Sequence, residues 1–70
     1  MTKNGITQEG RIIAELQTIV NREKFAVMRG DYETAMDARH EYEIASAFAE
    51  RITGKTIICR EWVVEYAKEN

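Results

Sequence analysis

The chain has 70 residues, 44% of them apolar, and a net charge of −2 from 10 Lys and Arg against 12 Asp and Glu. This length allows one domain over residues 1–70 with a thin core, and the apolar content is too high for a wholly disordered chain. The charge balance does not suggest the basic face of a nucleic-acid-binding protein, and no apolar run reaches the roughly 18 residues of a membrane span. The N-terminus lacks the apolar stretch of a signal peptide, so we expect a cytoplasmic protein without a membrane partner.

The devices that usually stabilise so small a domain are missing from the sequence. Cys59 is the only cysteine and His40 the only histidine, so neither a disulfide nor a Cys/His metal cluster is expected, and no cofactor is predicted. Small scaffolds of this kind often share their core with another chain. We therefore expect a homo-oligomer, a complex with a partner protein, or both.

The first predicted element is a helix over about residues 8–29, with Thr7 as its N-cap. Its apolar side chains are spaced for one helix face: Ile12, Ile13, Leu16, Ile19, Val20 and Val27. Glu23 falls near the centre of this stripe, where a carboxylate is costly unless it is paired. Two interpretations stay open: Glu23 reaches solvent at a frayed helix end, or it pairs with Arg39 or across an interface.

A very short turn follows at Arg29-Gly30-Asp31. Gly30 suits the left-handed conformation that closes a helix, and Asp31 suits the N-cap of the next helix. Two helices joined so closely usually fold back on each other, so we predict an antiparallel helical hairpin.

The second helix is predicted over about residues 32–53, ending at Gly54. A heptad seam rich in alanine runs along it: Ala35, Ala38, Tyr42, Ala45, Ala49 and Ile52. A second apolar row, formed by Ile44, Phe48 and Ile52, lies beside this seam. The later half of the helix is thus apolar over an arc wide enough to touch two neighbours.

The C-terminal segment, about residues 57–68, contains Ile57-Ile58-Cys59 and Trp62-Val63-Val64, which have high strand propensity. Its apolar spacing is nevertheless closer to 3.6 than to 2, and an isolated strand would have no partner in a helical chain. We therefore predict a short third helix here. The expected fold class is all-α: an antiparallel helical hairpin plus a short C-terminal helix, in an oligomer.

The charges are unevenly spread along the chain. Residues 1–30 hold five basic and three acidic side chains, for a charge of +2, whereas residues 31–53 hold two basic and six acidic ones, for −4. The first segment can therefore attract the second, either within one chain or between two chains.

No motif predicts an enzyme. Residues 49–56 loosely match a phosphate-binding loop, but that motif needs a strand before it, and here Gly54 is better explained as a helix C-cap. His40 is expected to be solvated and Cys59 to be a small core residue, and no base or oxyanion site is evident beside either one.

The sequence instead predicts a small, non-catalytic protein-interaction module that acts through helix–helix docking, such as a bacterial or phage accessory or regulatory protein. The candidate interface residues are Phe25, Met28, Tyr42, Ala45, Phe48, Ala49 and Trp62. The alternative is an oligomer that binds a small anion or nucleotide through Arg22, Lys24, Arg29 and Lys55.

The turn region resembles the UVR motif, a helical hairpin of nucleotide-excision-repair subunits and of some bacterial protease adaptors. The run Asp31-Tyr32-Glu33-Thr34-Ala35 is followed at suitable spacing by Arg39 and Tyr42, with Ala38 where leucine is usual and His40 where an acidic residue is common. The resemblance implies pairing of hairpins, with another copy or with a partner protein, and no enzymatic activity. The same turn is also similar to that of tetratricopeptide hairpins, but one hairpin is too little for a stacked repeat fold.

Overall fold

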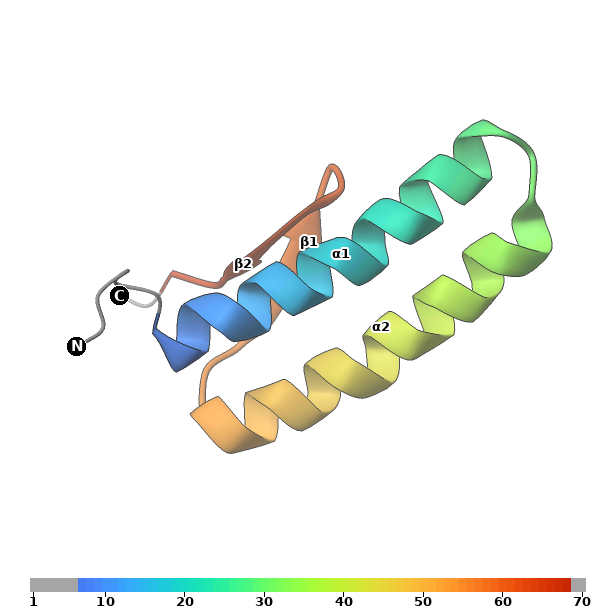
Figure 1. Cartoon of the computed structure of the whole chain (residues 1–70). Coiled ribbons are helices and arrows are strands. Elements are labelled where there is room, and N and C mark those ends of the chain that lie inside the picture. The colour runs from blue at the N-terminus through green and yellow to red at the C-terminus, as the bar shows by residue number, and fades with distance from the viewer. Residues whose placement is uncertain (1–6, 69–70) are drawn as a thin grey trace.

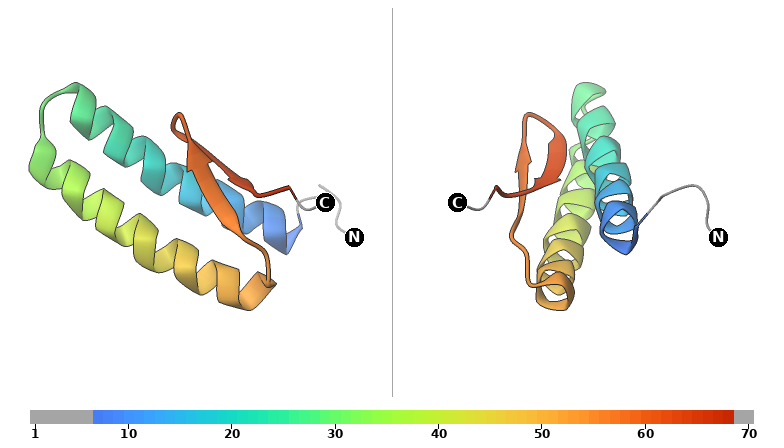
Figure 2. Two further views of the ribbon diagram at one scale, coloured as in Figure 1. Left: turned by 180° about the vertical axis from the view of Figure 1, so that it is seen from behind. Right: turned by 90° about the vertical axis from the view of Figure 1, so that its left-hand side faces the viewer.

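The computed structural model describes residues 7–68, which form two long antiparallel helices and a β-hairpin (Figure 1). Helix α1 spans Gln8–Met28 and helix α2 spans Tyr32–Thr53; strand β1 spans Ile57–Arg60 and strand β2 spans Val63–Tyr66. The strands form an antiparallel two-stranded sheet, which covers one face of the helix pair (Figure 2). The predicted helical hairpin is confirmed, with both helices within a residue of their expected bounds.

Side-chain and backbone caps define the ends of the helices. Thr7 Oγ1 accepts a hydrogen bond from the Gly10 N–H at 3.0 Å, and the Asp31 carboxylate accepts one from the Thr34 N–H at 3.2 Å. Gly30, at φ 78°, donates its N–H to the Val27 carbonyl, and the Asp31 N–H reaches the Ala26 carbonyl at 2.8 Å. These two bonds make a Schellman motif, which explains why the chain reverses within three residues.

The alanine seam packs α2 against α1. Ala38 and Ala49 are buried against three α1 side chains, namely Leu16, Ile19 and Val20. Small alanine side chains let the two helices approach closely, so larger residues of α1 fill the space between them. Tyr42 and Ala45 are partly buried at the edge of this core, whereas Ile52, the last seam position, is 56% exposed.

The expectation of a third helix, and with it the all-α class, is wrong. Gly54 ends α2 as predicted, in the left-handed conformation at φ 72°, and the chain then forms strands β1 and β2 in place of a helix over 57–68. Arg60 pairs with Val63, so only Glu61 and Trp62 form the turn, and both have positive φ angles of 51° and 69°. Positive φ at both central residues is the pattern of a type I′ turn, whose twist suits a two-residue hairpin.

The tail forms strands because it supplies both partners of the sheet itself. Glu-Trp gives little warning of a type I′ turn, which is usually built from Asn-Gly or Asp-Gly. Side chains alternate across the hairpin as strands require: Ile57 and Val64 are buried toward the helices, while Arg60 and Val63 remain exposed on the other side. The tail therefore completes the core with two apolar side chains, which a helix was expected to provide.

Polar side chains of the helices hold the hairpin in place. Gln17 of α1 bonds twice to β2 and its turn: its Oε1 accepts from the Val64 N–H at 2.9 Å and its Nε2 donates to the Trp62 carbonyl at 2.8 Å. Glu50 of α2 accepts from the Ile57 N–H at 2.7 Å. Each helix thus satisfies an outward-facing backbone group of the hairpin, and these contacts fix the sheet against one face of the helix pair.

Candidate functional site

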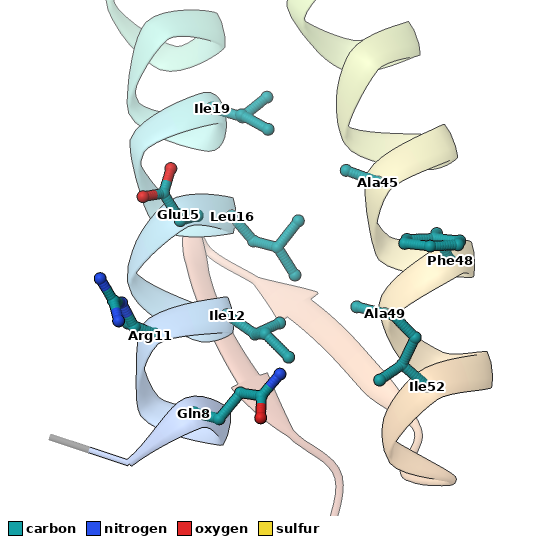
Figure 3. A pocket seen from close by; sticks show the side chains of 10 residues that line it. All are labelled: Gln8, Arg11, Ile12, Glu15, Leu16, Ile19, Ala45, Phe48, Ala49 and Ile52. Carbon is teal, nitrogen blue, oxygen red and sulfur yellow. The ribbon is translucent and has the colours of Figure 1, made fainter.

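A groove runs between α1 and α2 on the face opposite the hairpin (Figure 3). Its volume is about 630 Å³. Leu16 and Ala49, both buried, and the partly buried Ala45 lie along its floor. The full lining comes from both helices: Gln8, Arg11, Ile12, Glu15, Leu16, Ile19, Ala45, Phe48, Ala49 and Ile52. The same small α2 residues that allow the helices to approach therefore also leave this face hollow.

Large apolar side chains stand exposed along the α2 side of the groove. Phe48 is 61% exposed and Ile52 is 56% exposed, and Ile44, one turn before Phe48, is 60% exposed. These three residues are the second apolar row predicted beside the seam, and we call them the α2 ridge. Nothing in residues 7–68 covers the ridge, because the hairpin lies on the other face of the helices. Contiguous exposed apolar surface of this kind is typical of an interaction site.

Charged side chains border the groove. Arg11 and Glu15 lie on its α1 side, where Figure 3 shows both pointing away from α2. Further toward the interhelical turn, an ion pair joins the helices, with Arg22 Nη1 2.7 Å from Glu41 Oε1. Both of these side chains are about half exposed, so the pair adds little to the stability of the single chain. The groove is thus mainly apolar, with charged side chains on its α1 edge and an ion pair beyond its end toward the interhelical turn.

The predicted interface residues occupy three separate places. Ala45, Phe48 and Ala49 line the groove, whereas Tyr42 and Trp62 line a smaller cavity under the hairpin. The remaining two, Phe25 and Met28, are 54% and 70% exposed near the C-terminal end of α1. Ile12 and Ile19 also line the groove, but they were not predicted as interface residues, although both belong to the predicted apolar stripe of α1. The width of that stripe could have indicated them, because it is wider than a single packed helix can cover.

The smaller cavity, of about 270 Å³, lies between the hairpin and the helices. Glu23 lies in it and pairs with Arg39, at 3.4 Å between Oε2 and Nε, with the Glu23 side chain only 13% exposed. This contact confirms the pairing interpretation of Glu23. Burial raises the pKa of the Tyr42 hydroxyl, with smaller contributions from nearby negative charge.

Cys59 also lines this cavity but is exposed, so the prediction that it is a core residue is wrong. It lies on the inward side of β1, opposite Val64 and one residue before the end of the strand. Burial of the thiol, and then the charge of Glu23, raise the pKa of Cys59. A raised pKa leaves little thiolate at neutral pH, which is the opposite of what a nucleophile needs.

The four predicted anion-binding residues are not brought together. Arg22 pairs with Glu41, and Arg29 lies 3.7 Å from Asp31 at the interhelical turn. Lys55 lies beyond the far end of α2, where it contacts Glu9 at 2.9 Å. The fourth, Lys24, has its ammonium group 5.9 Å from the centre of the Phe25 ring. This dispersion gives no single positively charged pocket for an anion within residues 7–68.

The other chemical features are few. Within residues 7–68 no group of three or more His, Cys, Asp and Glu side chains is placed to hold a metal ion, and no helix there is long and apolar enough to cross a membrane. His40 is exposed on α2, as expected. Comparison of the chain with protein families, with curated proteins and with solved structures found no match.

Proposed function

We propose that the protein is a non-catalytic interaction module that docks a helix of another chain into the groove between α1 and α2. The observation that carries this proposal is the α2 ridge, where Phe48 and Ile52 stand more than half exposed beside a hollow of about 630 Å³. In a closed single-chain core these side chains would fill such a hollow. Here they border it, which is the arrangement expected of a surface completed by a partner.

A helix is the occupant that fits this shape best. Two antiparallel helices with small residues between them present a long, straight groove, and a further helix packs on such a surface at about 8–10 Å between axes. Amphipathic helices bind grooves through apolar anchors spaced three and four residues apart. The ridge residues Ile44, Phe48 and Ile52 have the same four-residue spacing and would interdigitate with such anchors.

The resemblance of the turn to the UVR hairpin agrees with this proposal, because the resemblance implies that the hairpin pairs with another hairpin. The proposal includes a cytoplasmic location and a role as an accessory or regulatory protein of a bacterium or phage. Interaction in this form requires no bound cofactor.

Site-specific photo-crosslinking tests the proposal. Phe48 is replaced by p-benzoylphenylalanine in the source cells, and Met36, which is 72% exposed on α2 outside the groove, receives the same replacement as the matched control. We expect ultraviolet light to produce a discrete protein adduct at position 48 and none at position 36. Position 48 giving no more adduct than position 36 would refute a docking role for the groove.

A further inference from the structure

We infer that the occupant of the groove is a second copy of this chain, placed by a two-fold axis that runs parallel to the helices. This inference rests on the proposed function, because it names the partner of the same groove. It predicts a four-helix bundle in which α1 of each copy lies over α2 of the other. The two β-hairpins then lie on the outer faces of the bundle, where each already covers its own helix pair.

The groove is complementary to itself. A two-fold dimer uses the same patch on both chains, so that patch must supply both the projecting side chains and the hollow that receives them. Phe48 and Ile52 project beside the groove, and Leu16 and Ile12 line its α1 side at the corresponding heights along the bundle (Figure 3). Rotation about an axis along the helices keeps these heights, so the ridge of each copy meets the apolar α1 wall of the other.

The distribution of charge selects this axis over the other face-to-face arrangement. An axis across the helices would place α1 on α1 and α2 on α2. Helix α1 has three basic and three acidic side chains, whereas α2 has two basic and five acidic ones, so this axis would bring together two α2 helices of charge −3. The axis along the helices places the neutral α1 of each copy on the acidic α2 of the other, which keeps the two acidic helices apart. Complementary charge fixes orientation in interfaces of this kind, and like charge opposes it.

One ion pair makes this argument specific. Arg22 and Glu41 lie at the same height, because they contact each other across the two helices at 2.7 Å. Exchange of α1 and α2 by the two-fold axis therefore places Arg22 of each copy opposite Glu41 of the other. Two half-exposed pairs become a four-membered network of alternating charge, which is worth more than the isolated pairs.

The face is also large enough. Helices of 21 and 22 residues are about 30 Å long, and two of them side by side present a face of roughly 600 Å² per chain. A specific interface needs about 1,000 Å² in total over both partners, so this face is sufficient. The gain is considerable for a chain of 70 residues that buries only nine apolar side chains in the part that the structure describes.

Sedimentation analysis of the purified chain over about 1–300 µM gives the first test. We expect wild type to sediment at twice its 8.1 kDa monomer mass at the upper concentrations. Phe48→Glu should weaken association by at least about 30-fold, since it places a charge at an apolar anchor, while Met36→Glu should leave it unchanged. Circular dichroism confirms that both variants stay helical, as expected for exposed positions.

Charge exchange between positions 22 and 41 is the second test, and it tests whether the two-fold axis runs along the helices. Arg22→Glu and Glu41→Arg should each weaken self-association, because each places like charges opposite one another in its own dimer. An equimolar mixture should recover dimers, since the glutamate introduced at position 22 of one variant then faces the arginine introduced at position 41 of the other. At the symmetry-related position of the mixed dimer, the unchanged Arg22 and Glu41 face each other.

The outcomes of these tests are distinguishable. A mixture no more dimeric than its components would overturn the arrangement about this axis. A monomeric wild type at every concentration would overturn the second copy as the occupant. An in-cell adduct of position 48 with a different protein would then still support the proposed function.

Discussion

Gln17 offers the sharpest test of how the β-hairpin is attached to the helices. Its side-chain amide accepts from the Val64 N–H at 2.9 Å and donates to the Trp62 carbonyl at 2.8 Å, so one residue of α1 satisfies two backbone groups of the hairpin. Gln17→Leu keeps a side chain of similar size but removes both bonds. Because Val64 is only 4% exposed, its N–H is poorly placed to find water in compensation.

The expected loss follows from these two contacts. A typical hydrogen bond contributes about 0.5–1.5 kcal/mol net, and a buried donor left without a partner costs about 1–3 kcal/mol. We therefore expect Gln17→Leu to lower the free energy of unfolding by about 2 kcal/mol. A chain of 70 residues has a total of about 4–10 kcal/mol, so the melting temperature should fall by about 10 °C.

Chemical denaturation measured with two signals is the appropriate assay. Circular dichroism follows the helices, and fluorescence of Trp62, the only tryptophan, follows the hairpin turn. Asn21→Ala is the matched control, because Asn21 bonds to the Gln17 amide at an exposed position. A loss below about 0.5 kcal/mol for Gln17→Leu, equal to that of the control, would show that the amide does not hold the hairpin.

Three further predictions concern the core, the turn and the thiol. Ala38→Leu should lower the free energy of unfolding by about 1–3 kcal/mol in denaturant melts, because Ala38 is 1% exposed between the helices; exposed Ala47→Leu should leave it nearly unchanged. Glu61→Asn should raise the melting temperature, since asparagine adopts the positive φ of this turn position more readily than glutamate, and an unchanged or lower value would contradict the turn assignment. Burial, and then the charge of Glu23, raise the pKa of Cys59, so alkylation of Cys59 should reach its half-maximal rate at a higher pH than alkylation of a free thiol. Glu23→Gln should lower the pH of this half-maximal rate. A half-maximal pH at or below that of a free thiol would be inconsistent with this environment.

The two helices were predictable because their signals are local. Thr7, Asp31 and Gly54 each act within one turn of their own helix, through a side-chain cap or a left-handed backbone. The pairing of Glu23 with Arg39 was also accessible, since a carboxylate in the middle of an apolar stripe needs a partner on the facing helix. Helix caps, the spacing of apolar residues and a carboxylate that needs a partner were thus sufficient to predict most of the helical hairpin.

The β-hairpin was less predictable because its strands stabilise each other. Each strand has four residues, too few for the difference between periods of 2 and 3.6 to be decisive, and the Glu61-Trp62 turn lacks the usual residues. Its attachment through Gln17 and Glu50 depends on contacts between residues 47 and 7 positions apart, respectively. Such contacts leave no periodic signal, so the error in the fold class and the missed role of Gln17 have the same cause.

The position of the hairpin also explains why the groove stays open. A third helix over residues 57–68 could have packed on either face of the α1–α2 pair. The hairpin is instead bonded to Gln17 on one helix and Glu50 on the other, which commits it to a single face. On the opposite face, Ala45 and Ala49 are too small to fill the space beneath Phe48, and no described segment remains to cover it. The alanines that stabilise the single chain by close packing are thus the same residues that leave a recess for another helix.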